Sequence, residues 1–203
     1  MAETVRRAPS GAAVLRPQIT ATITEAVLDA LAEHGYARLS MEAVAKRAGV
    51  GKSALYRRWP SKQDMVIAVL SGLSVPLAEV PDTGSLREDL LATLRAVCTW
   101  LTHPRMATIL PDLIAEAARN AALAEAIQAT IGEPRRTLAA ITLRRAIDRG
   151  ELPTDLDLEL ALDLLAAPLY WRLSVRQAPL EPDYLDQLAD HLLRALNATP
   201  QDR

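Results

Sequence analysis

The chain has 203 residues, half of them hydrophobic, and a net charge of −2. No apolar run reaches the roughly 18 to 20 residues of a membrane span and the first residues lack an apolar signal core, so we expect a soluble, cytoplasmic protein with no membrane partner. A single cysteine, Cys98, excludes an internal disulfide framework, and three widely separated histidines form no metal-ligand cluster. We expect no cofactor.

The small net charge conceals two oppositely charged parts. Residues 1–70 carry ten Lys or Arg and six Asp or Glu, a balance of +4, whereas the rest of the chain carries thirteen and nineteen, a balance of −6. All three lysines, Lys46, Lys52 and Lys62, lie in the first part. A basic surface confined to one part of a chain is typical of a protein that binds a polyanion such as DNA.

Helical patterns dominate from the start of the chain. There is no sustained period-two alternation and no Asn-Gly or Asp-Gly hairpin turn, so the sequence predicts an all-α fold. A first helix is predicted from about Pro17 to His34, with Gly35 as its stop. Ser40 is placed to cap a second helix of about two turns, which Gly49 ends.

A third short helix follows the glycine turn. It is predicted to begin near Gly51 and to end before Pro60, which cannot continue a helix, with Leu55 and Trp59 facing inward. Two short helices joined by a tight glycine turn and braced by a preceding helix form a helix-turn-helix, whose second helix enters the major groove of DNA. The sequence therefore predicts an N-terminal three-helix DNA-binding domain.

Cations cluster on this unit. Six of them and no acid lie between Glu42 and Asp64: Lys46, Arg47, Lys52, Arg57, Arg58 and Lys62. Recognition helices contact bases mainly from their N-terminal residues, so Lys52 and Ser53 are the candidates for base contacts. For Lys46 and Arg47 the alternative of plain solvated surface is favoured. Ser61, three residues before Asp64, has the spacing of a capping box that opens a fourth helix.

This segment resembles the DNA-binding domain of the TetR/AcrR family of transcriptional regulators over about residues 17–70. The resemblance rests on these positions: Ala48, Gly49, Val50, Lys52, Leu55, Tyr56, Trp59, Pro60, Ser61 and Lys62. Tryptophan stands at position 59 where phenylalanine is more usual. Glycine stands at position 51 where a serine commonly caps the recognition helix and contacts a phosphate.

The resemblance implies a role for each residue of the unit. The recognition helix would comprise Gly51, Lys52, Ser53, Ala54, Leu55, Tyr56, Arg57, Arg58 and Trp59. Groove contacts would come from Lys52 and Ser53. Phosphate contacts would come from Ser40, Tyr56, Arg57, Arg58 and Lys62.

After about Leu73 the composition changes to an acidic, Ala- and Leu-rich segment. Residues 76–84 form a Pro- and Gly-containing break, and six helices are predicted beyond it, near 85–101, 104–119, 121–131, 133–149, 155–177 and 182–197. We therefore expect a flexible basic arm over 1–16, the DNA-binding domain over 17–70, a helical effector-binding and dimerisation domain over 71–198, and a tail over 199–203. Arg6, Arg7 and Arg16 of the arm could reach a minor groove, but a disordered tail is the favoured alternative.

In the family the second domain binds a small effector and carries the dimer interface. Two leucine stripes fit such an interface or an internal core: Leu158, Leu162, Leu165, Leu169 and Leu173, then Leu185, Leu188, Leu192 and Leu196. A two-fold dimer predicts a palindromic operator. Candidate walls of a pocket for a small apolar or amphipathic effector are Trp100, His103, Met106, Tyr170 and Trp171. For each of them taken alone, plain core is the favoured alternative.

The sequence thus indicates a homodimeric transcriptional regulator of double-stranded DNA, foremost a repressor that a small molecule releases. The fourth helix, which links the domains, is the expected lever. The alternatives are a ligand-independent regulator or activator, and a helical small-molecule-binding or scaffolding protein without DNA binding. No catalytic residue is predicted, since the acids Asp155, Asp157 and Glu159 fit a helix start and no motif indicates an enzyme.

Overall fold

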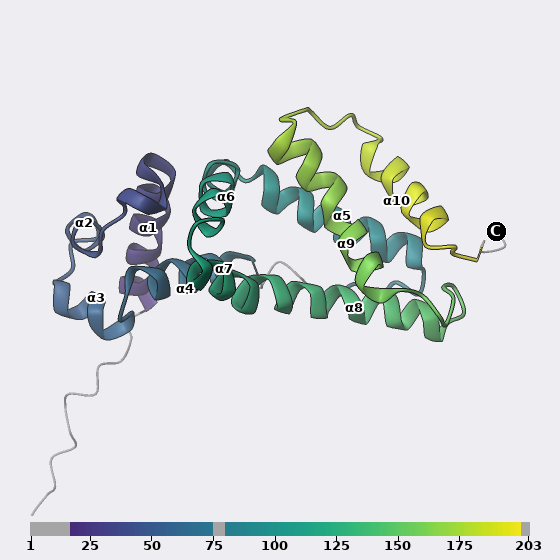
Figure 1. Cartoon of the computed structure of the whole chain (residues 1–203), viewed down its shortest axis with the longest axis horizontal. Coiled ribbons are helices and arrows are strands. Elements are labelled where there is room, and N and C mark those ends of the chain that lie inside the picture. Colours follow the sequence, from purple (N-terminus) through teal and green to yellow (C-terminus); the bar gives the residue numbers. More distant parts are fainter. Residues whose placement is uncertain (1–16, 75–79, 200–203) are drawn as a thin grey trace, which may run out of the picture.

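The computed structural model describes residues 17–74 and 80–199. Within these ranges the regular elements are all helices, which confirms the predicted all-α class (Figure 1). The predicted arm over 1–16 lies outside the described residues, as do residues 76–79 of the predicted break and all but the first residue of the predicted tail. No helix within 17–74 or 80–199 is both long and apolar enough to cross a bilayer.

Four helices form one end of the molecule: α1 (Pro17–Arg38), α2 (Met41–Arg47), α3 (Lys52–Arg58) and α4 (Lys62–Ser74). Their ends follow the predicted local signals. Ser40 Oγ accepts a hydrogen bond from the amide of Ala43 (3.1 Å), and Ser61 Oγ accepts one from the amide of Asp64 (3.1 Å). Gly49, with φ +65°, occupies a backbone conformation after α2 that favours glycine.

The first helix differs from the prediction at Gly35. This residue has φ +74° and ψ 170°, so the chain kinks there, but it resumes a helical turn and α1 ends only at Arg38. The predicted stop is therefore a kink. It lies against the carboxylate of Asp112, which comes from a helix distant in sequence.

Six further helices build the rest of the chain: α5 (Leu86–Thr102), α6 (Pro104–Ala117), α7 (Ala121–Ile127), α8 (Glu133–Asp148), α9 (Leu158–Tyr170) and α10 (Tyr184–Ala195). Two π-helical turns, η1 (Gln128–Gly132) and η2 (Trp171–Val175), follow α7 and α9. Each predicted helix is present. The predicted start at Asp155 moves to Leu158 because Asp157 is the N-cap, where its carboxylate accepts a bond from the amide of Leu160 (3.0 Å).

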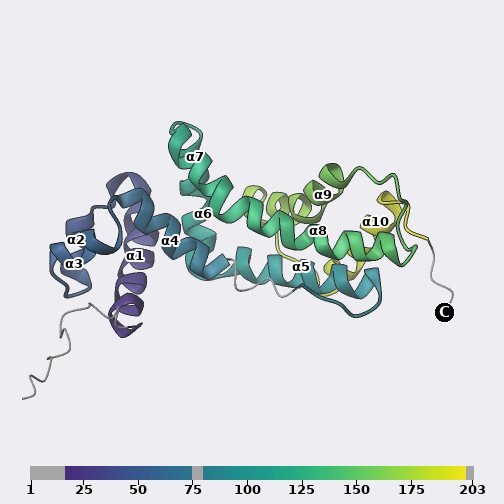
Figure 2. The ribbon, with the colours of Figure 1, turned by 90° about the horizontal axis from the view of Figure 1, so that it is seen from below.

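Two clusters of buried side chains hold these helices together. The first joins α1–α4 to α6, α7 and η1, and it contains Leu55 at no exposure, with Trp59 half-buried against it. The second joins α5, α8, α9 and α10. Both predicted leucine stripes contribute to this second cluster, so they pack within the protomer. Figure 2 shows the resulting arrangement, with α1–α3 at one end of the molecule and α5 and α8–α10 at the other.

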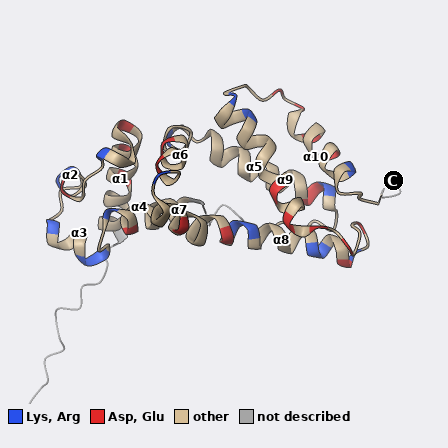
Figure 3. Ribbon diagram, viewed as in Figure 1, with Lys and Arg blue, Asp and Glu red and all other residues tan. Residues whose placement is uncertain are grey.

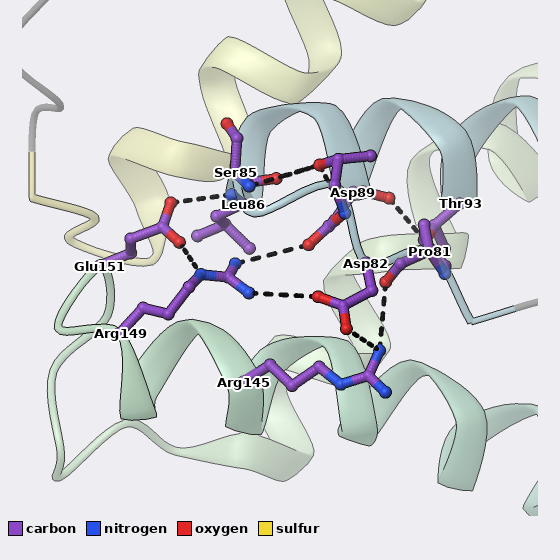
Figure 4. A network of polar contacts seen from close by, with 10 residues as sticks. Pro81, Asp82, Ser85, Leu86, Asp89, Thr93, Arg145, Arg149 and Glu151 are labelled. Carbon is purple, nitrogen blue, oxygen red and sulfur yellow. Dashed lines mark hydrogen bonds and ion pairs between the residues drawn. The ribbon is translucent and has the colours of Figure 1, made fainter.

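A polar network fastens the start of α5 to the end of α8 (Figure 4). Asp89 is fully buried, and its carboxylate accepts bonds from the amide and hydroxyl of Thr83 (2.8 and 2.7 Å) and from Arg149 (3.4 Å). Glu151 accepts the amide of Leu86 (2.7 Å) and also bonds Arg149. One guanidinium thus serves two buried carboxylates, which sets the position of α5.

Candidate nucleic-acid interface

The third helix, α3, has an apolar side that faces the interior and a polar side that faces solvent. Leu55 is buried, whereas Lys52, Ser53, Tyr56 and Arg57 are exposed, and Tyr56 is 48% exposed despite its aromatic ring. The predicted recognition helix coincides with α3, flanked by Gly51 as N-cap and Trp59 as C-cap. Figure 3 shows Lys and Arg on α3, at the outer end of the molecule.

Lys52 is engaged by an acid that sequence reasoning did not connect to it. Its Nζ forms an ion pair with Glu42 of α2, and both side chains are exposed. An exposed pair of this kind contributes about 0–1 kcal/mol. Lys52 can therefore leave Glu42 and bind a DNA group at little cost in free energy.

Lys62 lies differently from a free surface cation. Its Nζ donates to the carbonyl oxygens of Tyr36 (3.0 Å) and Ala37 (3.4 Å) and sits 4.3 Å from the centre of the Tyr36 ring. Burial, followed by the charges of Glu116 and Asp64, raises the pKa of Tyr36, so its ring stays neutral. An ammonium has three N–H groups, so one remains for the predicted phosphate contact.

The other predicted phosphate contacts vary in availability. Ser40 is exposed, and its hydroxyl hydrogen is free to donate while its oxygen caps α2. Arg57 is exposed, whereas Arg58 is half-buried and donates to the carbonyl of Ala54 (3.3 Å). Arg47 bonds Glu33, which lowers the pKa of that carboxylate. This pairing supports the solvated-surface alternative for Arg47.

Helix α6 contacts α1 through two polar attachments that the sequence did not reveal. Arg105 pairs with Glu25 (2.7 Å) and Asp29 (2.8 Å). Asp112 accepts a bond from the amide of Tyr36 (2.7 Å), directly after the kink at Gly35. The prediction named only α4 as the connection between the two parts.

A cavity of about 420 Å³ lies among α5, α6, α8 and α9. Of the five predicted wall residues, Trp100, Met106 and Tyr170 line it, whereas His103 and Trp171 do not. His103 is the exposed junction between α5 and α6, and Trp171 is 58% exposed, so these two residues do not belong to this site. Its volume is within the range of small-molecule sites.

Polar groups in the cavity wall were not predicted, because an arginine or threonine on a helix carries no signal of which side it faces. Arg135 and Thr142 of α8 line the cavity. Burial raises the pKa of the Cys98 thiol, which favours its neutral form, and Cys98 is not a wall residue. Within the described ranges no group of three or more His, Cys, Asp or Glu could hold a metal ion.

An exposed basic recognition helix on a helix-turn-helix, joined to a helical domain with an apolar cavity, defines a DNA-binding regulator of the two-domain type. The family model for "Bacterial regulatory proteins, tetR family" matches residues 23–69, and the model for "Tetracyclin repressor-like, C-terminal domain" matches residues 80–192. The chain belongs to the TetR family of DNA-binding transcriptional regulators.

Individual relatives agree with this assignment. An uncharacterized HTH-type transcriptional regulator of Mycobacterium tuberculosis is 34% identical over 163 residues, which is 80% of each chain. The DNA-binding transcriptional repressor TetR of Mycobacteroides abscessus is 33% identical over 178 residues, covering 87% of this chain and 93% of that one. The crystal structure of the TetR family transcription regulator SCO0332 matches with a TM-score of 0.70 at 34% identity, covering 87% of this chain and 97% of that chain.

Proposed function

We propose that the protein is a homodimeric repressor that binds a palindromic operator through α2 and α3 and releases it when a small effector occupies the cavity. The observation that carries this proposal is the double role of α6. Its side chains Met106, Leu110 and Leu113 line the cavity, while Arg105 and Asp112 hold α1 of the DNA-binding end.

The position of α6 between the two sites supports coupling between effector and DNA. A ligand that binds better to a position of α6 in which α1 and the recognition helix no longer fit the operator shifts the protein toward that state. Such a ligand lowers DNA affinity by the same factor by which DNA lowers ligand affinity. The relative in Mycobacteroides abscessus, which is named a repressor, supports the same sign of regulation.

Dimerisation is supported by apolar side chains that α9 and η2 leave uncovered. Leu160, Trp171 and Val175 are 57%, 58% and 47% exposed, although leucine stripes of the same segment are already packed inside the protomer. Large exposed apolar groups that gather on one element are typical of an interface. A two-fold axis there would place two α3 helices for half-sites about 34 to 36 Å apart.

The test is binding of the purified protein to DNA upstream of its own gene, measured by fluorescence anisotropy against a scrambled duplex across a salt series. We expect selective binding of two protomers per site, and in vitro transcription from that promoter should fall when the protein is added. Equal and steeply salt-dependent binding to both duplexes contradicts a specific operator at that location. Increased transcription would instead identify the alternative, an activator.

The variant Trp171→Ser tests the dimer. Trp171 is far from α3 in sequence and is not a wall residue of the cavity, so the variant keeps the recognition helix and effector site. We expect it to weaken self-association in sedimentation and operator binding together. An unchanged dimer would place the interface elsewhere.

A further inference from the structure

One arginine in the cavity wall has no counter-charge. Arg135 and Arg136 are neighbours on α8 and both line the cavity. Arg136 is neutralised from α9, where it pairs with Glu159 and with Asp163 (2.5 Å). Among the residues that the structure describes, Arg135 forms no ion pair or hydrogen bond, and its guanidinium lies 4.5 Å from the centre of the Trp100 ring.

Folding alone does not account for this arrangement. Burial lowers the pKa of Arg135, yet a guanidinium remains charged in any protein environment, so an unpaired cation persists beside apolar walls. Arg135 is half-buried, and withdrawing a charge from water even in part without a partner destabilises the folded state; stacking on an indole ring offsets only part of that cost. An anion from outside the protein would complete the pairing.

A second unsatisfied donor lies at the same place. The indole Nε1 of Trp100 is buried and has no hydrogen-bond partner. Trp100 and Arg135 come from different helices and are in contact, so the two unpaired donors lie in one part of the wall, where an oxygen that reached both would satisfy them together. The hydroxyl of Thr142 is also buried and unpaired, but it lies two turns further along α8, about 10 Å away by helical rise, which separates it from that oxygen.

The remaining wall is mainly aliphatic, with leucine, isoleucine, valine and alanine side chains from helices between α4 and α9. The acid Asp163 also lines it and is paired with Arg136. A planar carboxylate matches the fork of a single guanidinium, which donates two parallel hydrogen bonds. A phosphate group with two charges would require further cations, and Arg136 is already occupied. The polar end of the ligand is therefore small and singly charged, and the rest of it is apolar.

We infer that the cavity binds a carboxylate carried on an alkyl chain, with the carboxylate held by Arg135 and Trp100 Nε1 and the chain against the aliphatic wall. This inference rests on the proposed function only for the consequence of binding, namely release of DNA. Binding itself depends on the cavity alone. It is therefore measured without DNA.

The probes are octanoate, decanoate and dodecanoate, each compared with the alcohol of equal chain length by titration calorimetry at neutral pH. A charge-assisted hydrogen bond makes the acid bind at least about tenfold more tightly than its alcohol. Arg135→Met should remove this preference and leave alcohol binding within about twofold. Trp100→Phe, which keeps the ring and loses the donor, should reduce the preference in part.

Two matched controls test the assignment. Arg144→Met removes the same charge from an exposed site on α8 outside the cavity, and it should retain the acid preference. Thr142→Val removes the distant hydroxyl and should also retain it. If circular dichroism shows that Arg135→Met does not fold, Arg135→Lys and the comparison of acids with alcohols on the unmodified protein still test the inference. Lys keeps the positive charge but cannot donate two parallel hydrogen bonds.

Three results would overturn the inference: no binding of any of the three acids up to about 1 mM, equal binding of acid and alcohol, or an acid preference that survives in Arg135→Met. The operator assay separates this inference from the proposed function. Acid binding that requires Arg135 but leaves the operator complex intact supports the ligand and contradicts effector release. Release by a neutral compound, with no acid binding, supports effector release and contradicts the ligand.

Discussion

Gly35 lies where α1 of the DNA-binding end meets α6, and replacing it with alanine tests that junction. Its φ of +74° and ψ of 170° lie in a backbone region that is almost reserved for glycine. Another residue in this conformation loses about 1–3 kcal/mol of stability. A Cβ at this position would lie 2.7 Å from Asp112 Oδ1, so the carboxylate must move. Its bond from the Tyr36 amide, also 2.7 Å long, is then weakened, and a bond to a charged group contributes about 1.5–3 kcal/mol.

Together these terms predict that Gly35→Ala lowers the free energy of unfolding by about 3 kcal/mol or more, which corresponds to a fall of roughly 6 to 12 °C in Tm for a chain of this size. Thermal unfolding followed by circular dichroism measures the loss. Gly150→Ala is the matched control, since Gly150 has φ +75° and a Cβ at that position would have no neighbouring atom within 4 Å. The control should show a smaller loss, which comes from the positive φ without a clash.

A double-mutant cycle isolates the contact. Asp112→Ala alone loses the hydrogen bond from the Tyr36 amide. In the double variant Gly35→Ala/Asp112→Ala the new Cβ no longer clashes, because the carboxylate is gone. The stability losses of the two single variants should therefore add up to more than the loss of the double variant. Strictly additive losses would refute the reasoning about Asp112. A loss equal to that of Gly150→Ala would refute the close approach altogether.

Three further predictions concern the DNA-binding surface and the buried network. Lys52→Ala should reduce discrimination between operator and scrambled duplex by about 1–3 kcal/mol in competition anisotropy, and an equal loss for both duplexes would remove Lys52 from the base contacts. Glu42→Gln should free Lys52 and raise affinity for any duplex by up to about fivefold at low salt, whereas unchanged affinity would show that the pair does not compete with DNA. Arg149→Met leaves Asp89 buried without its cation and should lower the free energy of unfolding by about 2–3 kcal/mol, measured by chemical unfolding. This loss is less than for a fully buried pair because Thr83 still donates to Asp89. A loss as small as that of the exposed control Arg144→Met would contradict this role.

Much of the fold was predictable because its signals are local. Ser40 and Ser61 accept amide hydrogens three residues ahead, Gly49 ends α2, and Pro60 follows the end of α3. Each of these depends on a few consecutive residues. The apolar spacing that buries Leu55 is equally local, so the helix-turn-helix and the exposed face of α3 could be placed from the sequence.

The pairing of charges could not be placed in this way. Lys52 and Glu42 are ten residues apart on different helices, and Lys62 reaches the carbonyl of Tyr36 across 26 residues. Whether a cation on a helix faces DNA, an acid or a carbonyl depends on the angle at which the helices cross. The same holds for the leucine stripes, whose packing within the protomer left Leu160 and Trp171 exposed.

The sequence by itself determined the helices, their caps, the basic recognition helix and the family, because propensity, capping and side-chain periodicity act within one or two turns. Only the tertiary structure decided that Asp112 meets the kink at Gly35, that α6 joins the cavity to α1, and that Arg135 lines the cavity with no ion pair to any described residue. These features arise where helices distant in sequence pack together. Their energies depend on distances and burial that no single helix specifies.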